Sequence, residues 1–244
     1  EKSPTQKPLV PPPNWQADEL TRFLETAHQN RWATFANKPI AKRLIALDAC
    51  FDKAEKGLIN PQHKVAALLL LRTHASYRAG CEHAMAGQVV ETFIMIRACL
   101  ESAGYALHMA KTPGADIVWL NRHEDEASLK AARKLIEIGN VRATILACNQ
   151  KAAGVFDTLY QTAIDFGAHP NERAVTGSLN IERGKDHAEM QQLFLHGDGP
   201  QMDHALISMA RAGLCALEML QDVFKERFEL LGIRGELLSL RAGL

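Results

Sequence analysis

The segment that most constrains the fold is residues 88–111, because it reads as a helix that is apolar on nearly every side. At 100° per residue, one narrow stripe of this helix carries Val90, Ile94, Arg97, Glu101, Tyr105 and His108. The adjoining faces are apolar or small, and only Glu91 and Ser102 mark a wet edge. A helix of this kind must lie at the centre of a helical domain, so the rest of the chain is expected to pack around it.

The pattern on either side of this segment is also helical. Helical spacing begins after Asn14, a good helix cap, restarts at Pro39, and predicts further helices over residues 62–86, 127–138, 141–167 and 201–231. Alternating apolar residues at 172–197 predict a small inserted β-hairpin, and the proline-rich residues 1–13 predict an extended leader. We therefore expect an all-α fold, with residues 14–244 forming a single bundle of about seven helices.

Composition excludes several classes of protein. The 28 basic and 28 acidic residues cancel, so a generally basic surface for nucleic acid or an anionic membrane is not expected. The longest apolar run, residues 65–71, is far shorter than the ~20 residues that span a bilayer. Five cysteines without a CxxC pair favour free thiols in the cytoplasm, and we expect a homodimer.

Arg97 and Glu101 are the polar residues that do not belong on a central helix. Burying an unpaired charge costs several kcal/mol, and their i,i+4 spacing allows direct contact. One interpretation is a structural salt bridge that fixes the helix register. The other is the floor of a ligand pocket, with Arg97 binding an anion, Glu101 acting as its orienter or as a general base, and Tyr105 donating a hydroxyl.

Two further sets of residues are candidates for the same pocket. Trp119 and Arg122 could stack on a planar ligand, or they could form an amphipathic lid that seals the core. Asp165 could orient His169 as a general base, with Asn171 close by, or His169-Pro170 could simply end a helix. If a pocket exists, His169 or Asn171 should lie within about 8 Å of the 88–111 stripe, a reach set by one hydrogen-bonded intermediary.

Metal and nucleotide chemistry receive little support from the motifs. His187, His196 and His204 are scattered among acidic residues, but neither HExxH nor a repeated ExxH is present. There is also no P-loop, GxGxxG or GxSxG. We therefore expect no metal and no cofactor.

The residues that carry a family resemblance are 77–80, 87–88, 97–106, 119–122 and 167–171. Together they resemble uncharacterised bacterial all-helical proteins in which a long helix carries an Arg-x-x-x-Glu core and a His-Pro-Asn turn follows. Arg78 and His83 also have the spacing of the Arg-x(4 to 6)-His motif of HEPN-like bundles, although Ala79 stands where those ribonucleases have a polar residue.

Three function classes follow. The leading hypothesis is a small-molecule binding or regulatory protein for an anionic or planar ligand. The alternatives are a hydrolase or HEPN-like ribonuclease using His169 or the pair Arg78 and His83, and a structural or interaction protein whose buried salt bridge only sets register.

Overall fold

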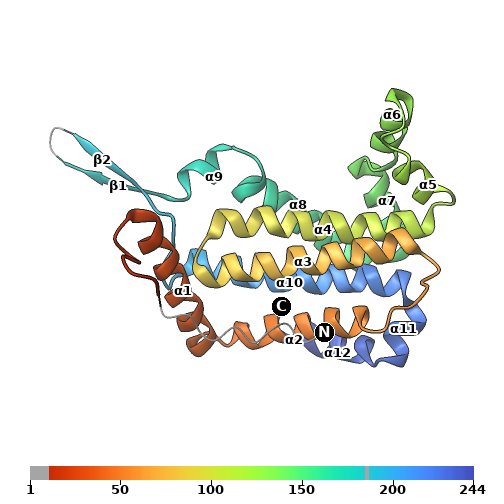
Figure 1. Ribbon diagram of the computed structural model, residues 1–244, viewed down its shortest axis with the longest axis horizontal. Helices are drawn as coiled ribbons and strands as arrows, with labels where there is room; N and C mark the ends of the chain where they lie inside the picture. The colour runs from red at the N-terminus through yellow and green to blue at the C-terminus, as the bar shows by residue number, and fades with distance from the viewer. Residues whose placement is uncertain (1–10, 185–186) are drawn as a thin grey trace.

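The computed structural model describes residues 11–184 and 187–244, and the fold within them is all-α with one small hairpin (Figure 1). The longer helices are α1 (Glu19–Asn37), α2 (Ile40–Glu55), α3 (Lys64–Ala86), α4 (Val89–Lys111), α7 (Ile138–Cys148), α8 (Gln150–Ala163) and α10 (Pro200–Val223). The shorter ones are α5 (Ala115–Leu120), α6 (Glu126–Leu135), α9 (Glu172–Thr176), α11 (Lys225–Leu230) and α12 (Ile233–Arg241). A π-helical turn, η1 (Ile164–Ala168), continues α8, and strands β1 (Leu179–Arg183) and β2 (Ala188–Gln192) form the hairpin.

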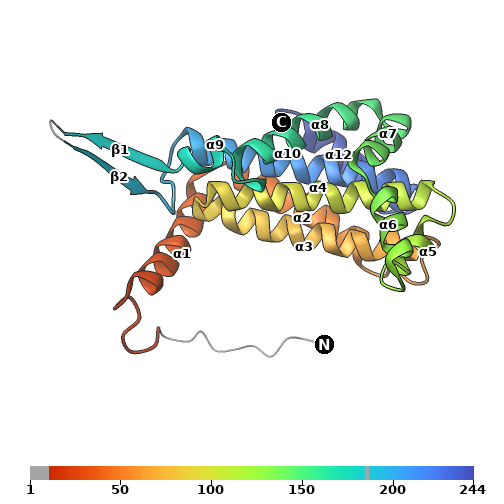
Figure 2. The same cartoon turned by 90° about the horizontal axis from the view of Figure 1, so that it is seen from above.

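Helices α3, α4 and α10 lie side by side and form the centre of the bundle (Figures 1 and 2). Helices α2 and α12 cover one side of this centre, while α7 and α8 cover the side of α4. The segment of α5 and α6 lies at the C-terminal end of α4, and the hairpin projects from the opposite end (Figure 1). Most faces of α4 are buried, as the sequence predicts, but its partly exposed side is the stripe that carries Ile94, Arg97 and Glu101. Ser102, which was expected at a wet edge, is buried.

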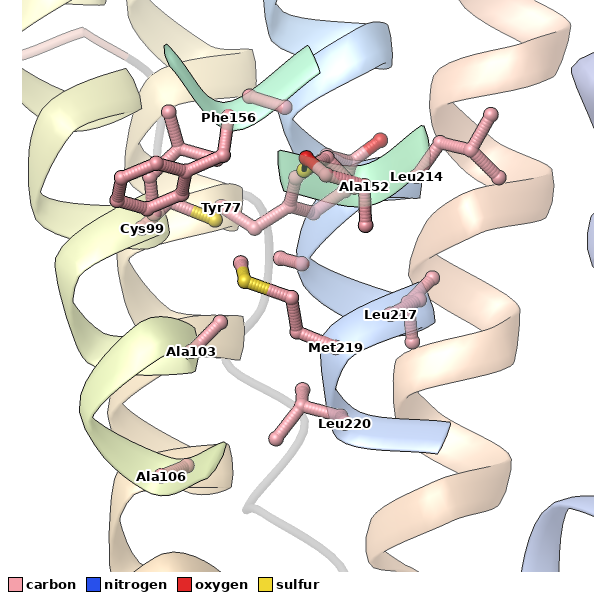
Figure 3. Packing of buried hydrophobic residues seen from close by; sticks show 14 of the residues in the cluster. Tyr77, Cys99, Ala103, Ala106, Ala152, Phe156, Leu214, Leu217, Met219 and Leu220 are labelled. Atoms are coloured by element: carbon pink, nitrogen blue, oxygen red, sulfur yellow. Dashed lines mark hydrogen bonds between the residues drawn. The ribbon is translucent and has the colours of Figure 1, made fainter. Parts of the chain in front are cut away.

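Close approach of α3 and α10 depends on two glycines. A Cβ on Gly80 would lie 2.3 Å from the Sδ of Met209, and a Cβ on Gly213 would lie 2.3 Å from Cε2 of Tyr77. Each glycine therefore makes room for a large side chain of the other helix. Tyr77 is fully buried in the core (Figure 3), and its hydroxyl donates to the carbonyl of Leu44 at 2.9 Å. Small residues at these two positions thus let α3 and α10 approach closely.

The hairpin and the helix ends refine the sequence prediction. Ile181 pairs with Met190 in an antiparallel register, inside the expected insertion. Helix α1 begins later than expected, because Asp18 rather than Asn14 caps it by accepting from the backbone N–H of Thr21 at 2.9 Å. The helix expected over 141–167 is divided into α7 and α8.

The division of that helix occurs at Asn149. Its backbone is extended, with φ −154°, and its side chain accepts from the backbone N–H of Ala152 to cap α8. Most of the expected leader, residues 1–10, lies outside the described residues. No helix among the described residues has the length and apolar character needed to cross a bilayer.

Candidate functional site

Arg97 and Glu101 form the expected direct contact on α4. The Nε of Arg97 donates to Oε1 of Glu101 at 2.8 Å, and the two side chains are 26% and 25% exposed. The pair is thus about three-quarters buried and still reaches solvent.

His169 lies directly against this pair. The Nη1 of Arg97 is 2.6 Å from Nε2 of His169, which confirms the expected proximity of the two segments. A guanidinium can only donate, so Nε2 accepts and the ring hydrogen sits on Nδ1. Arg97 therefore joins a carboxylate of its own helix to an imidazole that follows η1.

Tyr160 of α8 completes the group, which we call the polar cluster: Arg97, Glu101, Tyr160 and His169. The hydroxyl of Tyr160 donates to Oε1 of Glu101 at 2.8 Å, and its ring lies 5.3 Å from the guanidinium carbon of Arg97. Burial and the bond to Glu101 raise the pKa of Tyr160 to about 12, so its hydroxyl stays a donor at neutral pH. No local pattern marks Tyr160, because its partners lie far away in the sequence.

Tyr105 does not take the role expected of it. It is half-buried, and burial together with the charge of Glu101 raises its pKa. Across residues 11–184 and 187–244, however, no hydrogen bond of its hydroxyl is found. The hydroxyl that reaches Glu101 is that of Tyr160.

Asp165 does not orient His169. Its Oδ1 accepts from Gln161 at 3.0 Å, and its other oxygen is 3.9 Å from Arg173. The i,i+4 expectation fails because His169 has left the helix: the residue before Pro170 is extended, with φ −136° and ψ 149°.

Asn171 has a structural role in the fold. Its Oδ1 accepts from the backbone N–H of Ala174 at 3.0 Å and caps α9, while its Nδ2 donates to the carbonyl of Ile164 at 2.6 Å. Both ends of its amide are therefore used in fastening α9 to η1.

Trp119 and Arg122 do not join the polar cluster. They belong to the α5 region at the C-terminal end of α4, whereas η1 and α9 lie toward its other end (Figures 1 and 2). Trp119 packs against the core. This position fits the lid that the sequence offered as the alternative.

Arg78 and His83 are held by different partners. Arg78 donates twice to Asp48, at 2.7 and 3.0 Å, and the Nδ1 of His83 is 2.9 Å from the side chain of Gln88. The two side chains that the spacing of a HEPN-like motif singles out therefore have separate partners.

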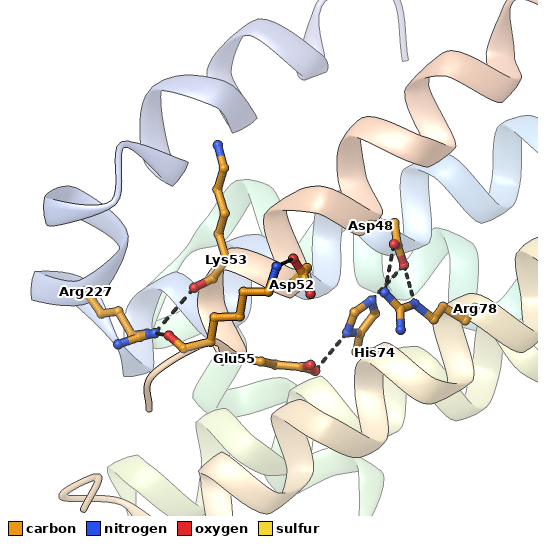
Figure 4. Close-up of polar contacts among 8 residues, drawn as sticks. Asp48, Asp52, Lys53, Glu55, His74, Arg78 and Arg227 are labelled. Atoms are coloured by element: carbon orange, nitrogen blue, oxygen red, sulfur yellow. Dashed lines mark hydrogen bonds and ion pairs between the residues drawn. The ribbon is translucent and has the colours of Figure 1, made fainter. Parts of the chain in front are cut away.

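Asp48 also belongs to a second group, the His74 cluster: Asp48, Glu55, His74 and Arg78 (Figure 4). His74 is 3% exposed, with Nε2 at 2.7 Å from Asp48 and Nδ1 at 2.8 Å from Glu55. Its ring stacks on Phe51 at 5.0 Å between centroids. Because His74 and Arg78 of α3 both contact carboxylates of α2, this cluster fixes α2 on α3.

A cavity of about 360 Å³ lies between α4, η1, α9 and α10. Its wall includes three rings that touch pairwise, Phe93, Phe166 and His204, with centroid separations of 5.3 to 5.4 Å. The guanidinium of Arg173 lies 5.8 Å from the Phe166 ring at the rim. We call this space the aromatic cavity.

The sequence did not point to the aromatic cavity. Its three rings come from α4, η1 and α10, and only folding brings them together. Among the described residues, no group of three or more His, Cys, Asp or Glu side chains is arranged so that it could hold a metal ion. The scattered histidines separate accordingly, with His196 buried beside Ser178 and His204 in the cavity wall.

No protein-family model matches the chain, and no curated protein or solved structure is significantly similar to it.

Proposed function

We propose that the protein binds a small anionic molecule with a planar, apolar body in the aromatic cavity. The observation that carries the proposal is a concave space whose wall is aromatic and whose rim holds a cation. Ligand pockets combine a mainly apolar wall with a few polar groups that fix orientation.

The wall determines the shape of the ligand. Phe93, Phe166 and His204 pack against one another in tilted and edge-to-face geometry, and an aromatic wall of this kind favours another flat ring. Arg173 is 67% exposed and its ion pair with Asp165 is long, at 3.9 Å, so its guanidinium can also contact an acidic group at the rim.

The polar cluster positions the wall of the cavity. Arg97 fastens His169 at one end of η1, and Gly167 packs directly on α4, where a Cβ would lie 2.3 Å from the carbonyl oxygen of Val90. Phe166 precedes this contact point. Arg97 and Glu101 are therefore positioning residues in this proposal.

Methyl NMR of Val89 and Val90, which line the cavity, tests the proposal with naphthalene-1-carboxylate and its neutral amide. We expect both compounds to shift these methyl signals, and the carboxylate to bind about tenfold more tightly, equal to about 1.4 kcal/mol. Arg173→Gln should remove that tenfold difference while the amide binds as before. Val90→Trp, which fills the space, should abolish both.

The matched control is Arg234→Gln, an exposed arginine that pairs with Glu229. This variant should bind both compounds as the wild type does. Unmoved Val89 and Val90 signals, or equal binding by the Val90→Trp variant, would contradict the proposal.

The enzyme alternatives have weaker support. The Nε2 of His169 already accepts from Arg97, and Asp165 is engaged with Gln161. A general base at His169 would have to break the first contact and would lack its orienting carboxylate.

We also propose a cytoplasmic homodimer. Five free thiols, four of them at least partly buried, support a reducing compartment. Leu20, Leu24, Trp32 and Phe35 leave α1 with exposed apolar side chains that a second copy could cover. Light scattering of the wild type and of Trp32→Glu tests this proposal, since a dimer through α1 should dissociate in the variant.

A further inference from the structure

A second cavity, of about 220 Å³, lies where α8 and α10 meet the C-terminal region of α12. Three basic side chains from three segments line it: Lys151, Arg211 and Arg241. Because the whole chain has no net charge, this gathering of cations is local. We call this space the basic cavity.

The only acidic side chain that lines the cavity, Glu218, is already paired with an arginine. Glu218 is 8% exposed, and its Oε1 accepts from both Nε and Nη2 of Arg241, the former at 3.0 Å. A buried carboxylate thus holds the guanidinium of Arg241 in place. Within the part of the chain that the structure describes, neither Lys151 nor Arg211 forms an ion pair.

The remaining side chains that line the basic cavity are aliphatic, Leu244 among them, apart from one thiol. Val155 and Leu214 line it, and the thiol of Cys215 donates to the carbonyl of Ala152 at 3.6 Å. Burial raises the pKa of the Cys215 thiol, which therefore stays neutral. Figure 3 shows Ala152 of α8 beside Leu214 of α10, at this junction.

We infer that the basic cavity binds a small amphipathic anion, namely an aliphatic chain that ends in a carboxylate or a phosphate. The aliphatic part of the ligand would lie on Val155 and Leu214, and its anionic head would contact Lys151 and Arg211. Glu218 fixes the position of Arg241 beside them. A guanidinium and an ammonium together bind an anionic head more strongly than either does alone.

This site is separate from the aromatic cavity. The two cavities share no lining residue, and on α10 the first uses the N-terminal end, near His204, whereas the second uses the turns from Arg211 to Glu218. The aromatic cavity has a ring-lined wall and the basic cavity an aliphatic one, so flat and flexible anions should discriminate between them.

Calorimetric titration of the full chain with hexanoate, hexyl phosphate and hexylamine tests the inference, and methyl NMR of Val155 and Leu214 locates the binding. We expect both anions to bind and shift those methyl signals, while hexylamine does not. Tighter binding of hexyl phosphate would assign a phosphate head, and tighter binding of hexanoate a carboxylate head.

The double variant Lys151→Gln/Arg211→Gln should weaken the preferred anion at least tenfold. The control Lys130→Gln/Arg234→Gln removes the same charge from exposed positions elsewhere and should bind as the wild type does. Anion binding that is unchanged in the Lys151/Arg211 variant, or that leaves the Val155 and Leu214 signals unmoved, would overturn the inference.

Discussion

Two clusters in this protein each combine an imidazole, a carboxylate and a guanidinium. The imidazole has opposite hydrogen-bonding roles in the two. In the His74 cluster, the imidazole lies between two carboxylates, at 2.7 Å from Asp48 and 2.8 Å from Glu55. In the polar cluster, the imidazole of His169 faces the guanidinium of Arg97 at 2.6 Å. One ring donates and the other accepts.

The difference shows how the neighbour decides what a histidine can do. Carboxylates only accept, so His74 satisfies both of them when each ring nitrogen carries a hydrogen. The guanidinium only donates, so Nε2 of His169 must offer its lone pair. His74 is 3% exposed, whereas His169 lies at the surface. Disrupting the two clusters should therefore lower the free energy of unfolding by different amounts.

The largest effect is expected for His74→Ala. The change opens a cavity beside Phe51 and leaves Asp48 and Glu55 without a shared donor, so the free energy of unfolding should fall by about 3 kcal/mol. Urea denaturation measures it. His123→Ala, at an exposed histidine, serves as the control and should change stability by less than about 0.5 kcal/mol.

A smaller loss is expected for Arg97→Met. A fully buried pair that loses one partner costs about 3–5 kcal/mol, but solvent still reaches a quarter of the Glu101 side chain. We therefore expect about 1–2 kcal/mol in the same denaturation experiment. A loss as large as that of His74→Ala would show that the two clusters do not differ in burial as described.

The smallest effect concerns the loss of stability at acidic pH. Although burial acts to raise it, hydrogen bonds from Arg78 and His74 hold the pKa of Asp48 below its ordinary value of 3.8. A lowered pKa in the folded state means that Asp48 contributes stability above about pH 4 and loses this contribution as the pH falls further. Between pH 5 and 3, Asp48→Asn should lose less stability than the wild type in urea denaturation at each pH.

The sequence predicted the central helix and the Arg97–Glu101 contact because both are local. The periodicity of residues 88–111 is a property of one segment, and the contact spans one helical turn. The proximity of His169 was also predicted, from the scarcity of other polar partners. The prediction that Asp165 orients His169 was wrong, because the extended backbone before Pro170 removes the i,i+4 geometry that this contact needs.

The rest of the candidate sites depends on distant segments. Phe93, Phe166 and His204 are each unremarkable in their own segment, and the space that they enclose exists only after α4, η1 and α10 pack. The same holds for the basic side chains at Lys151 and Arg211. A single sequence shows which side chains are unusual for their helix, whereas a cavity is a property of three helices at once.

The close packing of α3 on α10 at Gly80 and Gly213 also determines when the protein can form its core. Helices α3 and α4 are neighbours in the chain and can associate early, but the whole stretch from Lys111 to Pro200 must be synthesised before α10 exists. Closing so long a connection costs entropy that only the completed contact repays. Until Gly213 meets Tyr77, an emerging chain holds an unpaired apolar face, and a product that ends before α10 has no partner for it.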